Sequence, residues 1–342
     1  MSSIATVASP KKQVSHLQGL TPETLLKWHD EMLLMRRFEE KAAELYRSGK
    51  IGGFCHLYNG QEAVATGSIG ALTPEDYVIT AYRDHGQAIS KGVPPNAIMA
   101  ELLGKATGTT KGKGGSMHIF DRSKHFLGGH AIVGGHIPIA AGIAFALKYQ
   151  GTKNVCLCYM GDGATNIGSF HEALNLAALW KLPVIYIVEN NLYAMGTALD
   201  RSSAVGNLLK KALAYDMRSA DVNGNDVLEV YKAVKAAVDH ARQTSQPSFL
   251  DIRTYRYRGH SMSDPISGHY RTKEEVEEYK THDPINVFAD ILKKEGFITD
   301  KYIEDAEQRI KKIVEESVQF AENSPEPSPE QLYTDVYKES GS

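Results

Sequence analysis

Two continuous apolar runs in the middle of the chain each end abruptly in small or polar residues. The first run, 155–160, stops at Asp162 within a Gly-Asp-Gly turn, and the second, 184–188, stops at an Asn-Asn pair that ends with Asn191. Between them, the apolar residues of 170–178 recur at helical spacing. Continuous apolar strands separated by a helix are typical of a βαβ unit in a parallel sheet. Because a right-handed crossover leaves both strands pointing the same way, we expect Asp162 and Asn191 to lie close together at the carboxyl edge of the sheet.

The remaining apolar pattern extends this alternation of strands and helices. A long amphipathic helix is expected from Pro22 to Leu45, and Thr21 can cap its first turn. The other expected elements are strands at 77–80, 219–222 and 249–254, helices at 139–149, 227–243, 274–280, 285–295 and about 300–322, and a loop or broken helix at 201–211. The pattern predicts an α/β fold with a doubly wound parallel sheet and with added N-terminal and C-terminal helices and arms.

The 342 residues are expected to form one large domain with arms at both ends. Residues 1–19 are polar and mixed, which predicts a flexible N-terminal arm. Residues 20–323 are expected to form the α/β domain, including the charged C-terminal helices of 274–322. The prolines after residue 323 stop the last helix and predict an extended tail at 324–342.

Asp162 and Asn191 both offer hard oxygen donors at the expected sheet edge. Mg²⁺ prefers oxygen ligands and shares its coordination shell with substrate phosphates. Gly161 and Gly163 leave room for a ligand to approach the backbone, and a helix beginning after Gly163 would point its free N–H groups at the same place. Either piece alone could be an ordinary turn or loop. Their occurrence at the ends of two neighbouring strands favours a diphosphate held by one metal ion.

Composition and charge argue against several classes of protein. The formal net charge is −3 and 23% of the residues are charged, which does not suggest binding to nucleic acid or to a membrane surface. No apolar run approaches the roughly 20 residues needed to span a bilayer. The three cysteines argue against a disulfide scaffold, and no secretory segment is visible. A reducing, cytoplasmic location, bacterial in the first instance, is the default expectation, with an organelle matrix or stroma left open.

Two glycine-rich stretches could be mistaken for nucleotide-binding motifs. In KGKGGSMH, residues 111–118, the spacing from Gly108 is one residue too short for a phosphate loop. The dinucleotide motif that begins at Gly161 has Asn166 where its third glycine belongs. We expect 111–118 to be a mobile loop that lines a ligand site. GGHAIVGGHIP, residues 128–138, is expected to offer exposed backbone to a flat ligand.

Several polar residues in loops are candidates for recognition of the ligand. Arg83 follows an expected strand, and its planar donors match phosphate oxygens, although a surface ion pair is the alternative. His260 lies in a basic loop where it could donate a hydrogen bond to a phosphate oxygen or titrate near working pH. His56 lies among glycines and aromatics that can line a cavity, or it has a structural role. His130 and His136 are given no role.

Five separated motifs agree with one family. FCHLYNGQEA, TAYRDHG, KGKGGSMH, GDGATN with ENN, and YRYRGHSMSDP occur in this order from about Leu20 to the tail. Together they resemble the alpha subunits of heterotetrameric, thiamine-diphosphate-dependent 2-oxo acid dehydrogenases. Within that family, the sequences of these motifs are most similar to those of the members that act on pyruvate.

The resemblance implies a role for each matching position. The metal ligands would be Asp162, Asn191 and the carbonyl of Tyr193, with Mg²⁺ bound to the diphosphate of the cofactor. The diphosphate would be held by Tyr82, Arg83, Gly163, Ala164 and His260. Ala131 and Val133 would bond the aminopyrimidine ring through their backbones; Ala131 stands where the family commonly has glycine. His260 and His56 are implied at the reaction centre, where His56 would line the substrate cavity.

The implied activity is oxidative decarboxylation of pyruvate, with transfer of the acetyl unit to lipoyl groups of an acyltransferase in a multienzyme complex. The resemblance places an essential carboxylate on a separate beta subunit, so an α₂β₂ assembly is implied and the chain alone should be inactive. Its apolar helix face, glycine-rich loops and tail are expected to meet the partner. The motifs concern the shared cofactor, so an acetoin or branched-chain 2-oxo acid dehydrogenase alpha subunit remains open. A non-catalytic module that binds a magnesium nucleotide is the alternative from another class.

Overall fold

The computed structural model describes residues 17, 19–265 and 271–337. Its centre is a six-stranded sheet in the order β2-β1-β3-β4-β8-β7, in which every neighbouring pair is parallel. The strands are β1 (Tyr77–Ala81), β2 (Phe126–His130), β3 (Cys156–Gly161), β4 (Val184–Asn190), β7 (Arg218–Asn223) and β8 (Ser248–Arg253). The expected doubly wound α/β fold is confirmed.

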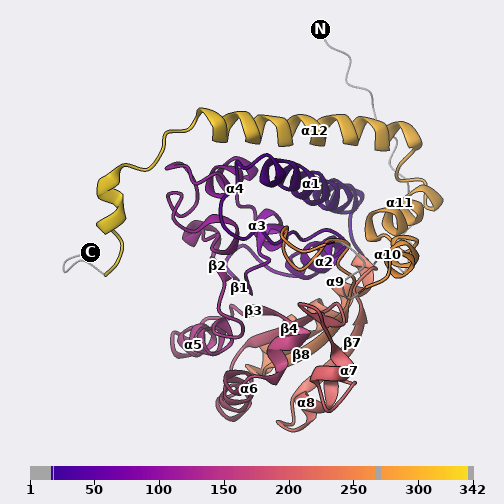
Figure 1. Cartoon of the computed structure of the whole chain (residues 1–342). Coiled ribbons are helices and arrows are strands. Elements are labelled where there is room, and N and C mark those ends of the chain that lie inside the picture. Colours follow the sequence, from indigo (N-terminus) through magenta and orange to yellow (C-terminus); the bar gives the residue numbers. More distant parts are fainter. Residues whose placement is uncertain (1–16, 18, 266–270, 338–342) are drawn as a thin grey trace.

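Helices cover both faces of the sheet (Figure 1). One core packs the sheet against α5 (His136–Tyr149), α6 (Gly168–Trp180) and α8 (Leu209–Leu213). The other core packs it against α1 (Pro22–Arg47), α2 (Glu62–Ile69) and α9 (Val227–Thr244). Along β3, Cys156 and Cys158 enter the first core, whereas Leu157 and Tyr159 enter the second. Burial on both faces explains why the central strands β3 and β4 are continuous apolar runs and do not alternate with polar residues.

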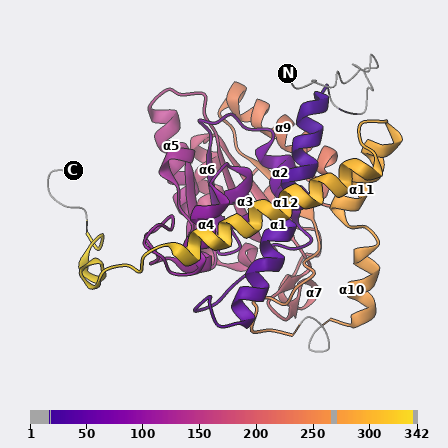
Figure 2. The same cartoon turned by 90° about the horizontal axis from the view of Figure 1, so that it is seen from above.

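The C-terminal helices form where the sequence predicts them, as α10 (Lys273–Lys280), α11 (Pro284–Lys294) and α12 (Asp300–Asn323). Figure 2 shows α12 crossing α1 and reaching α4 (Pro95–Leu102), and its buried apolar residues join the α1 core. The expected N-terminal arm lies almost wholly outside the described residues. The tail after α12 contains the 3-10 turn η5 (Pro329–Tyr333), and its Asp335 pairs with Lys111 and Lys113 of the body.

The structure differs from the sequence-based expectation at three places. The glycine-rich stretch after residue 125 contains strand β2, which pairs with β1. The Gly-Asp-Gly turn leads into the 3-10 helix η4 (Asp162–Asn166) before α6 begins, so no α-helix starts directly at Gly163. The stretch after Asn191 forms a small hairpin, β5 (Tyr193–Ala194) with β6 (Thr197–Ala198), and then α7 (Leu199–Ser202), followed by α8. Among the described helices, none combines the length and apolar character required to cross a bilayer.

Candidate active site

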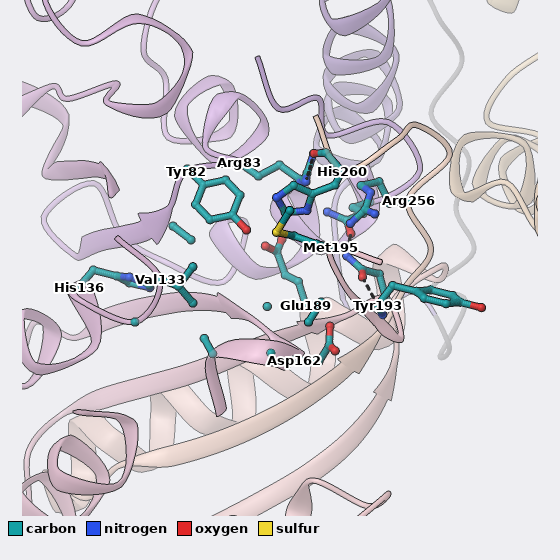
Figure 3. Close-up of a pocket in the computed structure, with 18 residues that line it drawn as sticks. Tyr82, Arg83, Val133, His136, Asp162, Glu189, Tyr193, Met195, Arg256 and His260 are labelled. Carbon is teal, nitrogen blue, oxygen red and sulfur yellow. Dashed lines mark hydrogen bonds between the residues drawn. The ribbon is translucent and has the colours of Figure 1, made fainter. Parts of the chain in front are cut away.

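A pocket opens at the carboxyl ends of the central strands, where the order of strand addition reverses. The chain passes from β1 outward to β2 and then returns to β3 on the other side of β1, and open α/β sheets bind ligands at such switch points. Tyr82 follows β1, Asp162 follows β3 and Asn191 follows β4, and all three line this pocket. The expectation that Asp162 and Asn191 lie close together is therefore confirmed. The other expected residues in the lining are Arg83, Val133, Gly163, Ala164, Tyr193 and His260 (Figure 3).

The Asp162 carboxylate is buried and has an oxygen without a hydrogen bond. Asp162 is only 1% exposed, and Oδ2 has no hydrogen-bond partner within the described part of the chain. Burial raises the pKa of Asp162 to about 6, because the charged form is disfavoured away from water. A cation placed beside Oδ2 would remove this penalty.

The Asn191 side chain is oriented by its neighbours. Its Nδ2 donates to Oε1 of Gln61 at 3.2 Å, and its Oδ1 accepts from the backbone N–H of Tyr193 at 3.3 Å. Among the described residues, no group of three or more His, Cys, Asp or Glu side chains forms a metal cluster. A cation here would instead depend on one carboxylate together with amide and carbonyl oxygens. That oxygen-only donor set fits Mg²⁺.

The two glycines of the turn have different roles. A Cβ on Gly163 would lie 2.6 Å from the Cβ of Ala194, so glycine lets the turn pack against the β5–β6 hairpin. A Cβ on Gly161 would meet open space. Both glycines line the pocket, and at Gly163 the contact with Ala194 is a second reason for the absence of a side chain.

Two buried guanidinium groups lie at the end of the pocket near His260 (Figure 3). Arg83 is 7% exposed and Arg256 is 2% exposed, and both line the pocket. Arg83 donates to the backbone carbonyls of Leu57 at 2.5 Å and of His260 at 2.7 Å. These bonds fix the guanidinium and also hold the His260 loop in place. Two fixed cations suit an anionic ligand such as a diphosphate.

The histidines at this end are held neutral in the ligand-free protein. Burial, reinforced by the charge of Arg83, lowers the pKa of His260 to about 3 and the pKa of His56 to about 2. The expectation that His260 could titrate near working pH therefore does not hold without a ligand. Nδ1 of each is buried without a hydrogen-bond partner in the described residues. His56 is not part of the lining, but its ring centroid lies 4.6 Å from that of Tyr82 and 5.2 Å from that of His260.

The turn after β2 supplies the opposite side of the pocket. Val133 lines it and is 49% exposed, whereas Ala131 is not among the lining residues. The neighbouring Ile132 is 77% exposed, so this side carries uncovered apolar surface. His136, at the start of α5, also lines the pocket, and its Nε2 donates to the carbonyl of Tyr159 at 2.6 Å.

The loop at 111–118 does not line the pocket, contrary to expectation. Instead, the fully buried Glu101 carboxylate accepts hydrogen bonds from four backbone N–H groups, one just before the loop and three within it. The donors are Thr110, Gly112, Gly114 and Gly115, at 2.8, 2.9, 2.8 and 3.1 Å. Within the described part of the chain, the loop approaches the site through Ser116, whose Oγ accepts from the backbone N–H of His56 at 3.2 Å.

Comparison with known proteins agrees with this geometry. The family model described as "Dehydrogenase E1 component" matches residues 30–330. The chain is also similar to the "Pyruvate dehydrogenase E1 component subunit alpha" of Rickettsia bellii, with 50% identity over 92% of this chain and 96% of the relative. The proteins of the same name from Rhizobium meliloti and Porphyra purpurea are 48% and 45% identical. They cover 98% and 92% of this chain, and 97% and 93% of their own lengths.

The chain belongs to the dehydrogenase E1 component family. This E1 family generally uses thiamine diphosphate. The matched range includes every strand of the sheet and all of the pocket-lining residues.

The E1 pocket also contains residues to which the sequence pattern assigned no role. Gln61 orients Asn191, and Arg256 supplies the second buried cation. Glu189 lies just before the Asn-Asn pair; Gln87 Nε2 donates to its carboxylate at 2.9 Å, and Tyr58 also donates to it. Burial raises the pKa of Glu189 to about 7. Met195 comes from the hairpin that follows β4. The motif GQE and the basic run after β8 were available signals for Gln61 and Arg256.

The buried histidines of this E1 chain should make the cofactor-free protein sensitive to acid. Burial lowers the pKa of His136 from 6.5 to about 4. The unfolded chain therefore binds more protons than the folded chain between these pH values, so this contribution to stability is complete above pH 6.5 and is lost as the pH falls. His136→Gln keeps a donor for Tyr159 and should reduce the pH dependence of the unfolding free energy by about 1.4 kcal/mol per pH unit.

Urea unfolding at several pH values between 4.5 and 7.5 would measure this difference. The exposed His282 provides the matched control, because His282→Gln changes the same side chain at the surface. Equal pH dependence for His136→Gln and wild type would contradict the expectation.

Proposed function

We propose that this chain is the alpha subunit of a thiamine-diphosphate-dependent pyruvate dehydrogenase. The observation that carries the proposal is the pocket in which a buried, unsatisfied carboxylate, an oriented amide and two buried guanidiniums converge. Relatives named for pyruvate dehydrogenase match more than nine-tenths of the chain and of their own length, which supports pyruvate as the substrate. The product would be an acetyl unit transferred to a lipoyl group of an acyltransferase.

The cofactor would be held at both ends of its diphosphate. Asp162, Asn191 and the carbonyl of Tyr193 would bind Mg²⁺, with the backbone of Gly163 and Ala164 beside the phosphates. Tyr82, Arg83 and His260 would contact the diphosphate from the other side, and Arg256 adds positive charge. Val133 and Ala131 would bond the aminopyrimidine through backbone atoms.

When bound, thiamine diphosphate supplies the carbanion that adds to the 2-oxo group and the electron sink that allows carbon dioxide to leave. The chain's own residues would position the cofactor and shield the reaction centre from water. His56, Tyr82 and His260 form an aromatic cluster with ring centroids 4.6 to 5.6 Å apart. Neutral His56 and His260 can each donate one hydrogen bond and accept one. Next to the anionic diphosphate, the pKa of His260 should rise, which would favour its role as a donor.

A beta subunit would complete the site. The pocket is bordered by the exposed Ile132 and Val133, and the helices that follow carry further exposed apolar side chains. We call this the α5–α6 face; it comprises Ile139, Phe145, Tyr149, Leu179 and Trp180, which are 46, 48, 85, 68 and 46% exposed. Phe145 lies 5.7 Å from Trp180 and 6.3 Å from Tyr149 between ring centroids, so these three aromatic side chains form one patch. Contiguous apolar patches of this kind mark interaction sites.

The partner is inferred to supply the carboxylate that the aminopyrimidine requires, within an α₂β₂ assembly. Such an enzyme would work in the cytoplasm, with its acetyl product passed to the multienzyme complex.

The proposal can be tested by producing the chain with and without its beta subunit. Substrate-dependent acylation and reduction of a lipoyl acceptor would be measured with pyruvate, acetoin and branched-chain 2-oxo acids, in the presence and absence of thiamine diphosphate and Mg²⁺. We expect turnover only for the assembled protein, with pyruvate as the preferred substrate. Preference for acetoin or for a branched acid would reassign the substrate. Binding of ATP or NAD without any binding of thiamine diphosphate would overturn the proposal.

A further inference from the structure

The segment that follows the hairpin folds back over the turn that carries Asp162. α7 ends at Ser202 and α8 begins at Leu209, and both lie beside η4. Asn166, the last residue of η4, donates from Nδ2 to the carbonyl of Ser202 at 3.0 Å. This segment is the stretch expected to be a loop or broken helix, and the proposed function gives it no role.

Lys211 of α8 makes the closest polar contacts to this turn. Its Nζ donates to the carbonyl and to Oγ1 of Thr165, at 2.9 and 2.8 Å, and to Oδ1 of Asn166 at 2.7 Å. All three protons of the ammonium group are therefore used on two consecutive residues. The carbonyl of Thr165 lies at the C-terminal end of a helical turn, where carbonyls lack intrahelical partners and cations are favoured.

These contacts continue directly to Asp162. Thr165 is fully buried, and its Oγ1 donates to the backbone carbonyl of Asp162 at 2.7 Å. Because this hydroxyl donates its single proton to Asp162, it must accept from Lys211, so the three groups form one oriented chain of hydrogen bonds. On the other side, the turn is packed against Ala194 at Gly163. Lys211 itself does not line the pocket.

We propose that Lys211 is a positioning residue that locks the Asp162 turn in the conformation that binds Mg²⁺. The magnesium affinity of the site then depends on a side chain that acts through Thr165 and does not touch the ligand. This inference rests on the proposed function, since it concerns the same metal and cofactor.

Simple electrostatics predicts the opposite sign, which makes the proposal easy to test. A lysine near the site repels Mg²⁺, so if charge alone mattered, Lys211→Met would strengthen magnesium binding. If Lys211 acts as a clamp, the same substitution releases the turn and weakens binding. Lys211→Arg keeps the charge and offers more donors. If Lys211 acts as a clamp, this variant should therefore bind Mg²⁺ nearly as tightly as wild type.

The experiment uses the chain assembled with its beta subunit. Mg²⁺ is titrated calorimetrically at a fixed concentration of thiamine diphosphate, and the midpoint gives the apparent magnesium affinity. We expect Lys211→Met to weaken it by about five- to twentyfold, the scale of lost charge-assisted hydrogen bonds at a partly exposed site. Lys211→Arg should lie within about threefold of wild type by the same reasoning. Lys210→Met is the matched control, since Lys210 is the exposed neighbour on the same helix, and it should leave the midpoint unchanged.

Asn166→Ala provides a second test if Lys211→Met does not fold, because it removes one acceptor and the bridge to Ser202 at an exposed residue. We expect it to weaken magnesium binding about two- to fivefold. An unchanged or tighter magnesium midpoint in Lys211→Met, or in Asn166→Ala when Lys211→Met does not fold, would overturn the proposal. So would equal weakening in the Lys210→Met control. If the wild-type assembly shows no magnesium-dependent binding of thiamine diphosphate, the proposed function fails as well. If wild type binds and the variants bind equally well, the role of Lys211 alone fails.

Discussion

Replacing Asp162 with alanine should abolish magnesium-dependent binding of thiamine diphosphate to the assembled enzyme. Among the described residues, two carboxylates line the pocket, Asp162 and Glu189, and Glu189 is already engaged by Tyr58 and Gln87. Removal of one partner of a buried charge pair costs about 3–5 kcal/mol, which is a loss of affinity of more than a hundredfold. Calorimetric titration of thiamine diphosphate at saturating Mg²⁺ would measure it. Binding within a few-fold of wild type would mean that the metal is held elsewhere.

Asp162→Asn separates this loss of binding from a loss of folding. The pKa of Asp162 is raised to about 6 in the folded protein, so the folded state binds protons more tightly than the unfolded state. Stability from this group is therefore gained as the pH falls and lost as it rises through 6. At pH 8 the cofactor-free Asp162→Asn protein should melt no lower than wild type, while still failing to bind. Asp200→Ala, an exposed change on α7, is the control and should bind as wild type does.

Phe145→Glu should prevent assembly with the beta subunit while leaving the alpha chain folded. Phe145 is 48% exposed and lies at the centre of the α5–α6 face, between Tyr149 and Trp180. A charge at the core of an apolar interface loses its hydration without gaining a partner, so the expected effect on assembly is several kcal/mol. In the free alpha chain, the same side chain remains in contact with water, and stability should change little.

Co-expression with a tagged beta subunit, followed by size-exclusion chromatography, would measure assembly. The rate of pyruvate decarboxylation by the same samples would then show whether the assembled protein is active. Leu213→Glu is the control, because Leu213 is 66% exposed on α8 and lies outside the α5–α6 face. Assembly of Phe145→Glu at wild-type yield would show that the partner binds another surface. Failure of both variants would point to a general effect of added charge.

The central geometry could be predicted from the sequence because it depends on neighbouring elements. β3 and β4 are consecutive strands joined by one helix, so the pairing of Cys156 with Val184 follows from short-range pattern and a right-handed crossover. Asp162 and Asn191 then come together without knowledge of the rest of the fold. The C-terminal helices could also be predicted, because the signals that start a helix are local: in the structure, Asp283 and Thr299 are N-caps that accept from the backbone.

Features that depend on distant segments could not be predicted in the same way. β2 is rich in glycine and shows no apolar run, and it becomes a strand only because β1 is beside it. Gln61 and Asn191 are 130 residues apart and meet only once the loop before α2 has folded over the sheet. The role of Gly163 depends on Ala194 in a hairpin of two-residue strands, which is too short to produce a sequence signal.

The most direct measurement is the position of the metal in the assembled enzyme. A crystal of the assembly would be grown with thiamine diphosphate and Mn²⁺ in place of Mg²⁺, and the anomalous signal of manganese would locate the ion. We expect one manganese peak per pocket, in contact with the Asp162 carboxylate, the Asn191 amide oxygen and the Tyr193 carbonyl. Bound thiamine diphosphate with a manganese ion held by other residues, or with none at this turn, would contradict it.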